Sequence, residues 1–549
     1  MQRDLAKMAK AHFDVLVIGG GITGACVAYD AAMRGLKVAL VEKKDFSWAT
    51  SAATSKLIHG GLRYLKNFEF GLVRESLRER RILTLIAPHQ VLPKAFLVPT
   101  YRGTSNNFPM IAAGMILYDL FSYDKANLPD PKRRLPHFKL FSKNGTLREE
   151  PNVDPRKLSG GALYYDCQMH YPERLTLEFV LGAAAHGAQA ANYAEVVGLN
   201  MAHDTVSGAK VRDLIDGAEY DLTADLTVNV SGTWADHLSG MALGEAHKKK
   251  VLRSQGIHLV FRKVIDKHAV VLRTSGGRHF FLIPWRGLTL AGTTDSVYEG
   301  TPDDYTVTHA AAEDFLREIN EAYPAAQVTM DDVTWTYGGL RPIVEDETEV
   351  ELSSYDASRK YEIYDHAKDD KINGFVTVIG GKYTTSRHLA QQLVDLALTK
   401  LGKPAVPCPT AAKPLPGGNI PYWDDFVVKG EQAHPETDKE MVERLSLDFG
   451  SRRDEVFALM GNATLAARLD EREPVPAAAA VLAVEQEMAL TLEDVLWRRI
   501  GLGNTGLLSR EAVEKTAAIV GDKLGWDEAR RTKEIDHALD LLARKNMAG

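Results

Sequence analysis

The segment from Phe13 to Glu42 constrains the fold more than any other part of this chain. An apolar run, FDVLVI, ends in a glycine turn from Gly19 to Gly24, and a helix of small residues then runs as far as Gly35. A second apolar run, KVALV, leads directly to Glu42. This order predicts a strand, a tight turn, a helix and a second, parallel strand, which is the first crossover of a doubly wound α/β sheet.

The glycine spacing in this crossover is typical of a dinucleotide site. Gly19 permits the tight turn, Gly21 lets a pyrophosphate approach the backbone, and Gly24 lets the helix pack closely on the strand. The helix start offers free N–H groups and a positive dipole end to phosphate. Glu42 lies eighteen residues after Gly24, where it can accept hydrogen bonds from both ribose hydroxyls and would repel a 2′-phosphate. The predicted ligand therefore contains adenosine and is not NADP.

A second stretch, Gly501 to Gly506, has the same glycine spacing. It follows the helix-like run TLEDVLWRRI and has no apolar strand beside it. Because the spacing indicates a nucleotide site only between a strand and a helix, no site is predicted there.

Length and composition narrow the class of protein. A chain of 549 residues predicts two to four structural units. The net charge of −7, from 66 basic and 73 acidic residues, offers no general attraction to nucleic acid. Three cysteines without a CxxC pair favour a reducing location, and seventeen histidines without HxxxH or HExxH spacing predict no metal site.

No signal peptide or membrane span is predicted. The first dozen residues lack the apolar run of a signal peptide. The most apolar stretch, around 110–120, is bounded by Pro109 and Asp119 and is too short to cross a bilayer. Membrane contact would therefore be peripheral. Basic clusters at 132–134 and 248–250 could meet anionic headgroups or could be ordinary solvated surface.

Three separate apolar strands are each followed by glycine. They end near residues 18, 230 and 379, and the third meets Gly380 and Gly381 before a helix that starts at Lys382. Carboxyl ends of parallel strands meet at one edge of an open sheet, so these glycines should border one crevice. The small, polar run from Trp48 to Ser55 is predicted to be a loop along the ligand.

The rest of the chain divides into recognisable parts. Residues 90–160 combine short strands with Pro-rich turns, and 255–341 predict an antiparallel sheet from runs such as GIHLVFR and HFFLIPW. The five prolines of 401–418 indicate a linker. Beyond it lies a helix-rich region with a capping box at Thr491 and Asp494.

With these motifs in view, the chain resembles the flavin-dependent glycerol-3-phosphate dehydrogenases. The resemblance runs from about residue 13 to 395 and rests on DVLVIGGGITGA, TSKLIHGGLRYL, QGIHLV, FLIPW followed by AGTTD, YGGLRP and VIGGKYTT in this order. It implies an α/β fold in which a Rossmann-like FAD-binding domain accompanies an antiparallel-sheet substrate domain and a C-terminal helical domain. The corresponding prediction is an oxidoreductase region at 1–400, with FAD-binding parts near 13–90, 160–245 and 340–400 and substrate-side parts near 91–159 and 246–339. A linker at 401–418 and a helical domain at 419–549 complete it.

The resemblance also implies noncovalent FAD and names the residues that hold it. They are Gly19, Gly21, Gly24, Glu42, Thr50, Ser51, Ser55, Lys56, Leu57, Val196, Gly232, Gly380, Gly381, Lys382 and Thr384.

Oxidation of a secondary alcohol needs one acceptor for a hydride and another for a proton. FAD would supply the first. The second should be a side chain that is neutral near pH 7, which favours His258 over any arginine. Lys382 is the alternative base if burial lowers its pKa. His258 could instead be a structural strand histidine, and either residue could merely orient the hydroxyl. The helix start at Lys382 is also suited to stabilise negative charge on the flavin.

A phosphate on the substrate requires fixed cations, and the guanidinium fork matches phosphate oxygens. Arg63 and Arg341, which stand beside glycines in HGGLRY and GGLRP, are the predicted phosphate ligands, and Arg341 is counted among the catalytic residues. The glycines are expected to leave space for the ligand. A surface ion pair is the other interpretation of each arginine. Tyr64 and Thr294 could add hydroxyl donors.

Three functions follow as hypotheses. The first is a dehydrogenase that passes electrons from glycerol 3-phosphate to ubiquinone or menaquinone, in the cytoplasm and peripherally attached to the inner face of the cytoplasmic membrane. A homodimer is compatible with this hypothesis, and no nucleic-acid partner is predicted. The second is an oxidase that uses oxygen and releases peroxide. The third is a flavin-binding protein that recognises RNA or a partner without turnover.

Overall fold

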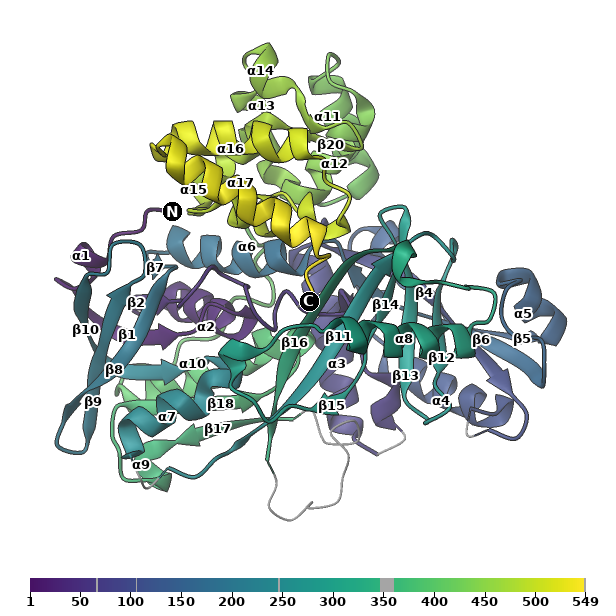
Figure 1. The fold of residues 1–549 in the computed structure, drawn as a ribbon. Helices are drawn as coiled ribbons and strands as arrows, with labels where there is room; N and C mark the ends of the chain where they lie inside the picture. The colour runs from purple at the N-terminus through teal and green to yellow at the C-terminus, as the bar shows by residue number, and fades with distance from the viewer. Residues whose placement is uncertain (66–67, 105, 245–246, 346–359, 548–549) are drawn as a thin grey trace.

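The computed structural model describes residues 1–65, 68–104, 106–244, 247–345 and 360–547. Figure 1 shows a broad body that contains two large sheets, with a helical domain formed by the C-terminal part of the chain standing on one side of it. The predicted fold class is confirmed: a doubly wound α/β part, a largely antiparallel part and a C-terminal helical domain are all present.

The first sheet has eight strands and carries the glycine turns. Its main path runs in the order β17, β18, β10, β1, β2, β7, and β8 and β9 extend it from β10. The strands β1, β2, β7, β10 and β18 are parallel, whereas β17 and β9 pair in antiparallel fashion. Their bounds are β1 His12–Ile18, β2 Val38–Val41, β7 Gln189–Ala191, β8 Ala194–Ala202, β9 Thr205–Asp213, β10 Glu219–Asn229, β17 Tyr361–Asp365 and β18 Phe375–Gly380.

The central strand β1 is buried on both faces, which explains its continuous apolar sequence. Val15 and Val17 belong to the core that contains the helices α2 (Ile22–Met33), α6 (Pro172–Ala185) and α10 (Ser386–Lys400). Leu16 and Ile18 face the opposite core, which β8, β9 and α7 (Ala235–Leu243) close. Ile18 is in register with Asn229 of β10, and Asn229 with Thr377 of β18, so the ends of the three strands lie side by side as predicted.

The second sheet has ten strands and lies beside the first. Its path is β15, β11, β14, β13, β12, β4, β6, β3, with β16 paired to β11 and β5 to β6. The helix α8 (His309–Ala322) packs on one face, and α3 (Phe70–Ile86) and α4 (Phe108–Phe121) belong to the core on the other. The bounds are β3 Leu57–Ile58, β4 Val91–Tyr101, β5 Lys139–Ser142, β6 Leu158–Met169, β11 Val251–Phe261, β12 Ala269–Arg273, β13 His279–Trp285, β14 Leu288–Gly292, β15 Ser296–Val297 and β16 Val333–Val344.

The expectation of short strands between residues 90 and 160 is confirmed only in part. The segment contains one short strand, β5, but also the long strand β4 and the helix α4, and β4 pairs along almost its whole length with β6, which begins at Leu158. The prolines Pro93 and Pro99 lie inside β4 because its neighbour β12 pairs only with Phe96 and Leu97. Neither proline interrupts that ladder, and so the missing N–H groups are tolerated.

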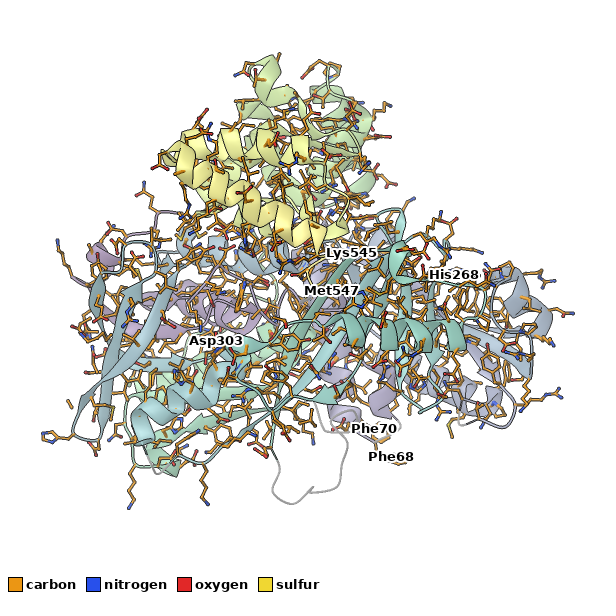
Figure 2. The ribbon with its side chains drawn as sticks, in the orientation of Figure 1. Phe68, Phe70, His268, Asp303, Lys545 and Met547 are labelled. Atoms are coloured by element: carbon orange, nitrogen blue, oxygen red, sulfur yellow. The ribbon has the colours of Figure 1, made fainter. Side chains whose placement is uncertain are left out.

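Within the described residues, the C-terminal domain contains seven α-helices, one π-helix and one short hairpin. Residues 402–422, which lead to it, contain neither helix nor strand. The end of the chain returns to the body, where Lys545 O accepts a hydrogen bond from Thr336 N at 3.0 Å, and Figure 2 shows Lys545 and Met547 at this junction. The bounds are α11 Trp423–Ala433, α12 Lys439–Phe449, α13 Arg453–Leu459, α14 Ala463–Ala466, β19 Arg468–Asp470, β20 Glu473–Pro476, α15 Ala477–Glu487, α16 Arg510–Leu524 and α17 Glu528–Ala543; the remaining short helices of the body are α1 Leu5–Met8, α5 Lys143–Glu149 and α9 His366–Asp369.

The predicted capping box at Thr491 and Asp494 is present. Asp494 N donates to Thr491 Oγ1 at 3.1 Å, and Thr491 N donates to Asp494 Oδ2 at 3.0 Å. The segment Asp494–Arg499 that follows is a π-helix and not the expected α-helix. The wider turn brings Arg498 and Arg499, which are adjacent in sequence, to the same buried carboxylate.

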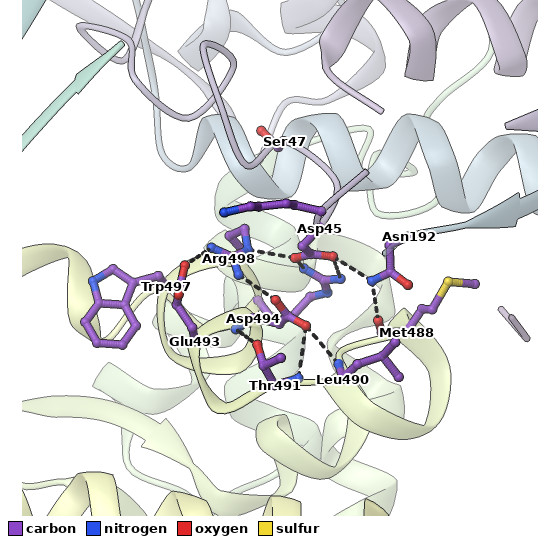
Figure 3. Close-up of polar contacts among 12 residues, drawn as sticks. Asp45, Ser47, Asn192, Met488, Leu490, Thr491, Glu493, Asp494, Trp497 and Arg498 are labelled. Carbon is purple, nitrogen blue, oxygen red and sulfur yellow. Dashed lines mark hydrogen bonds and ion pairs between the residues drawn. The ribbon is translucent and has the colours of Figure 1, made fainter. Parts of the chain in front are cut away.

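That carboxylate belongs to Asp45, in the loop after β2, and it joins the C-terminal domain to the nucleotide-binding part (Figure 3). Its oxygens accept two hydrogen bonds from Arg499, at 2.7 and 2.8 Å, one from Arg498 at 2.8 Å and one from Asn192 at 2.9 Å. Arg498 also pairs with Asp494. Asp45 is fully buried, so removal of one arginine would leave a charge without compensation.

Candidate functional site

A large cavity, of about 1870 Å³, runs from the glycine turn of the first sheet to the face of the second. Small-molecule pockets commonly measure roughly 300–1,000 Å³, so this one has room for a dinucleotide together with a small substrate. It is lined by most of the predicted site residues, namely Gly19, Gly21, Glu42, Thr50, Ser51, Ser55, Leu57, Tyr64, Val196, Gly232, His258, Arg341, Gly380, Gly381, Lys382 and Thr384.

The glycine turn is as tight as the sequence predicts. Gly19 has a φ of +115°, and a Cβ at this position would lie 2.7 Å from the carbonyl oxygen of Val230. A Cβ on Gly24 would lie only 1.8 Å from the carbonyl oxygen of Gly19. Gly24 therefore does not line the cavity, and it acts by allowing α2 to start against the end of β1.

Glu42 and Ser51 complete this cradle with polar contacts. Glu42 accepts hydrogen bonds from Gly20 N at 2.6 Å and Lys44 N at 2.9 Å, and its burial raises its pKa. Ser51 Oγ accepts from Ile22 N at 2.9 Å, at the first turn of α2. A carboxylate at the end of β2 and exposed N–H groups at a glycine N-cap fit the ribose and pyrophosphate of FAD.

His258 lies on β11, in the wall of the cavity, and is almost fully buried. Its Nε2 is 2.9 Å from Ser55 Oγ, and its ring stacks on that of Tyr337 with centroids 4.7 Å apart. Gly292 faces it across the ladder, where a Cβ would lie 2.0 Å from the imidazole. Burial, and then the charge of Arg341, lower the pKa of His258 well below 6.5, so the ring is neutral at physiological pH.

Arg341 reaches the same cavity from β16. Its Nη2 donates to Thr293 Oγ1 at 2.7 Å, and its Nη1 lies 3.3 Å from Asp295 Oδ2. A Cβ at Gly256 would lie 1.9 Å from Nη2, so the absence of a side chain at Gly256 makes room for the guanidinium. Arg341 is in register with Ser254 and therefore lies on the same face of β11 as His258, four residues further on.

Two glycines near the predicted phosphate arginines, Gly60 and Gly338, do not leave space for a ligand as expected. A Cβ at Gly60 would lie 2.5 Å from the hydroxyl of Tyr118, and one at Gly338 would lie 2.4 Å from that of Tyr305. Protein side chains already fill the space that Gly60 and Gly338 leave, so these two glycines permit tight packing around the site. Gly61, by contrast, lines the cavity.

Lys382 follows β18 and lines the cavity, but the α-helix expected to start there begins at Ser386. A short 3-10 turn, Tyr383–Thr385, lies between them. Lys382 Nζ donates to Ser76 Oγ at 2.6 Å and lies 4.6 Å above the ring of Tyr64. Arg63 belongs to the same 3-10 helix as Tyr64, but its side chain lies outside the part that the structure describes.

Besides Gly24, the predicted residues Lys56 and Thr294 do not line the cavity. Lys56 is buried with its Nζ 3.8 Å from a carboxylate oxygen of Glu173, and burial lowers its pKa. Thr294 Oγ1 accepts a hydrogen bond from Ile257 N at 3.0 Å, and its carbonyl accepts from Arg341. Both side chains therefore lie behind the residues that line the cavity and stabilise their positions.

The sequence interpretation missed the residues that hold Arg341. Thr293 and Asp295 line the cavity on either side of Thr294, in the AGTTD run, and Ser254 donates to Asp295 Oδ1 at 3.0 Å. A polar TTD run directly after a buried strand was the available signal. Its pairing with an arginine 46 residues away was not visible in the sequence.

Comparison with known proteins agrees with this geometry. Residues 14–387 match the family described as FAD dependent oxidoreductase, and 408–531 match the C-terminal domain of alpha-glycerophosphate oxidase. The chain is 34% identical to a glycerol-3-phosphate dehydrogenase of Synechocystis sp. over 547 residues, which is 97% of each protein. It is 32% identical to the aerobic glycerol-3-phosphate dehydrogenase of Bacillus subtilis, over 99% of this chain and 97% of the other.

Solved structures show the same relationship. The glycerol-3-phosphate dehydrogenase of Bacillus halodurans, solved with FAD, superimposes with a TM-score of 0.79 at 27% identity, covering 99% of this chain and 96% of that one. An L-alpha-glycerophosphate oxidase of Mycoplasma pneumoniae shares the fold over 73% of this chain and 98% of its own, with a TM-score of 0.52 at 18% identity.

Proposed function

The chain belongs to the FAD-dependent glycerol-3-phosphate dehydrogenase family, and on this premise we propose that it oxidises sn-glycerol 3-phosphate to dihydroxyacetone phosphate. The observation that carries the proposal is the continuity of the cavity. It joins a nucleotide cradle, a buried neutral histidine and a fixed arginine in one continuous space. When bound, FAD would supply the acceptor for the hydride that leaves C2 of the substrate.

His258 is the group that we assign to the hydroxyl proton. Its neutral ring can accept a proton near pH 7, and the contact with Ser55 and the stack on Tyr337 fix its orientation. The nearby charge of Arg341 lowers the pKa of free His258. A dianionic phosphate on Arg341 offsets that charge and raises the pKa of His258 when substrate is present. Substrate binding thus strengthens the base.

Arg341 is the phosphate ligand in this proposal. Asp295 and Thr293 hold the guanidinium in place, so little side-chain entropy is lost when the phosphate binds. A fixed, partly desolvated cation binds a dianion more strongly than an exposed one. Lys382, at the end of β18, is then free of the phosphate role and can stabilise negative charge on the cofactor.

The electron acceptor in the proposal is a membrane quinone, and the enzyme would lie on the inner face of the cytoplasmic membrane. Part of the cavity wall is apolar, from Phe68, Met110, Ile111, Ala113 and Leu117, which suits an acceptor with a hydrocarbon tail. The alternative acceptor is oxygen.

Two measurements test these statements. FAD-replete protein should lose its flavin absorbance when glycerol 3-phosphate is added without oxygen, and an unchanged spectrum would contradict the substrate assignment. Fast turnover in air with one peroxide per substrate, without quinone, would instead assign the oxidase reaction.

A further inference from the structure

A second cavity, of about 550 Å³, lies where the C-terminal domain meets the rest of the molecule. It is lined by parts of the loop 48–56, of β16, of the π-helix Asp494–Arg499 and of the end of α17. We call it the junction cavity. Small-molecule pockets commonly measure roughly 300–1,000 Å³ and occur preferentially at domain interfaces. The junction cavity therefore has the size and the position of a binding site in its own right.

The wall between the two cavities contains the loop that is predicted to contact FAD. Thr50 Oγ1 donates to the carbonyl oxygen of Leu340 at 2.6 Å, and the hydroxyl of Tyr337 donates to the carbonyl oxygen of Thr54 at 2.8 Å. These two hydrogen bonds attach the loop to β16. Thr50 and Ala53 line both cavities. A ligand in the junction cavity would therefore contact the same loop that FAD contacts from the other side.

Tryptophan is concentrated around the junction cavity. Four of the seven tryptophans of the chain line it. They form two pairs, with ring centroids 5.9 Å apart for Trp48 and Trp234 and 5.6 Å apart for Trp335 and Trp497. Figure 3 shows Trp497 and Glu493 close to Arg498 at the domain junction. Aromatic side chains bind flat ring systems by stacking, and every nucleic-acid base offers such a flat face. The walls therefore favour a flat ring over a sugar or an acyl chain.

Within the described part of the chain, three residues of the junction cavity have a buried polar atom without a hydrogen-bond partner. These atoms are Glu173 Oε2, the hydroxyl oxygen of Tyr305 and Trp497 Nε1. Glu173 is 6% exposed and Trp497 is 7% exposed. Buried polar groups nearly always have a partner, so three of them around one cavity indicate a ligand with matching groups. A carboxylate accepts, an indole N–H donates and a hydroxyl does both, so the ligand needs donors and acceptors along its edge.

The charges around the junction cavity disfavour a phosphorylated ligand. Among the described residues that line it, each basic side chain has an acidic partner that also lines it. The pairs are Lys56 with Glu173 at 3.8 Å, Arg498 with Glu493 at 2.6 Å and Arg544 with Asp540 at 3.0 Å. Phosphate is normally recognised by charge-assisted hydrogen bonds from Arg or Lys, and these cations are already in use. The arrangement therefore suits an uncharged ligand.

We propose that the junction cavity binds a purine base or nucleoside, and that this ligand stabilises the loop 48–56 in the conformation that retains FAD. A purine ring is flat, carries hydrogen-bond donors and acceptors along its edge, and has no charge as a nucleoside. It would stack on the tryptophans and form hydrogen bonds with the groups that lack a partner. The inference does not depend on the proposed function, because it concerns cofactor retention and not the substrate.

The first test is calorimetric titration of the FAD-saturated protein with adenosine. Adenosine should bind, AMP should bind no more tightly than adenosine, and ribose, which has no ring to stack, should not bind. Tyr305→Phe removes one hydroxyl without a partner and should weaken adenosine binding about twofold to tenfold. Tyr298→Phe is the matched control, because this ring lies 5.4 Å from that of Tyr305 and lines neither cavity. The control should bind adenosine like the unmodified protein.

A second pair of variants blocks the junction cavity itself. Leu541→Trp adds bulk to the wall formed by α17 and should abolish adenosine binding. Ala543→Trp, on the same helix, is at an exposed position outside the cavity and should leave adenosine binding unchanged. If Leu541→Trp fails to fold, Tyr305→Phe keeps the test valid, because it removes a single atom that has no partner.

The second measurement is the loss of FAD after dilution of the holoenzyme, followed by flavin fluorescence. Adenosine should slow this loss about fivefold or more, and it should have no effect in Leu541→Trp. Adenosine binding without slower loss of FAD would overturn the proposed role of the loop.

Four results would overturn the site. They are no binding of adenosine to the FAD-saturated protein, equal binding by Tyr305→Phe and the unmodified protein, tighter binding of AMP than of adenosine, and faster loss of FAD with adenosine. The last result would show that adenosine competes for the nucleotide cradle. If glycerol 3-phosphate does not bleach the flavin while adenosine behaves as expected, the proposed function is wrong and the junction site stands.

Discussion

The substitution Gly24→Ala adds only one methyl group and should weaken the binding of FAD. The added Cβ would lie 1.8 Å from the Gly19 carbonyl oxygen and 3.1 Å from Val230 Cγ2, and contacts below 3.0 Å do not occur. The start of α2 must then move by more than 1 Å. Hydrogen bonds do not survive such a displacement. Loss of two charge-assisted bonds to the pyrophosphate, at roughly 1.5–3 kcal/mol each, weakens FAD binding by roughly two to four decades.

The assay is a titration of the apoprotein with FAD, followed by flavin fluorescence. Gly461→Ala is the control, because a Cβ there has nothing within 4 Å and should leave FAD affinity unchanged. Overpacking should also lower the free energy of unfolding of the Gly24 variant by about 1–3 kcal/mol. If Gly24→Ala binds FAD within threefold of the unmodified protein, the close contact between α2 and β1 does not position the phosphate site. Gly24→Val, with a larger wedge, should yield protein without flavin.

Three further outcomes follow from the site and the domain interface. Arg341→Ala should lower kcat/KM for glycerol 3-phosphate by at least about tenfold to a hundredfold, from the loss of one charged hydrogen bond, with FAD still bound; loss of flavin would make Arg341 a cofactor ligand instead. Burial lowers the pKa of His258 well below 6.5. As the pH is lowered, kcat/KM should therefore stay level past pH 6.5 and fall only at the more acidic pH where the ring is protonated. His258→Asn should abolish this acid limb and Lys382→Met should keep it, whereas the reverse would make Lys382 the base. Burial raises the pKa of Glu487, but the ion pair with Arg174 outweighs burial and lowers the pKa to about 2. The ion pair therefore contributes fully to the free energy of unfolding above the unfolded pKa of about 4.3. This contribution is lost as the pH falls through about 2. Glu487→Gln should therefore cost about 3–5 kcal/mol in urea unfolding at pH 7, a deficit that shrinks at pH 3.

The nucleotide cradle was predictable from the sequence because its determinants are local. The run from Phe13 to Glu42 specifies β1, α2 and β2 within thirty residues, and Gly24 acts on the carbonyl of Gly19 in the same turn. The meeting of β1, β10 and β18 was also predictable, because continuous apolar strands that end in glycine favour one parallel sheet.

The features that the sequence did not predict depend on partners far along the chain. Lys56 was expected at the cofactor, but its buried contact with Glu173 comes from a helix more than a hundred residues later. The contact of Arg341 with Asp295 likewise forms only when β16 pairs with β11. The composition of α4 did not predict its exposure, because an apolar run of this kind is also typical of a buried core helix. Burial of that run is decided by the tertiary packing of its neighbours.

The carboxylate of Asp45, shared by two arginines of the C-terminal domain, limits how the enzyme can move during its cycle. Separation of the two parts would leave each of these buried ions without its partner until it regained water, which is costly. We therefore expect the C-terminal domain to stay attached to the nucleotide-binding part throughout the cycle and not to open and close as a lid. A protease cut in the segment 402–422 should leave both fragments travelling together through a sizing column, still yellow with flavin.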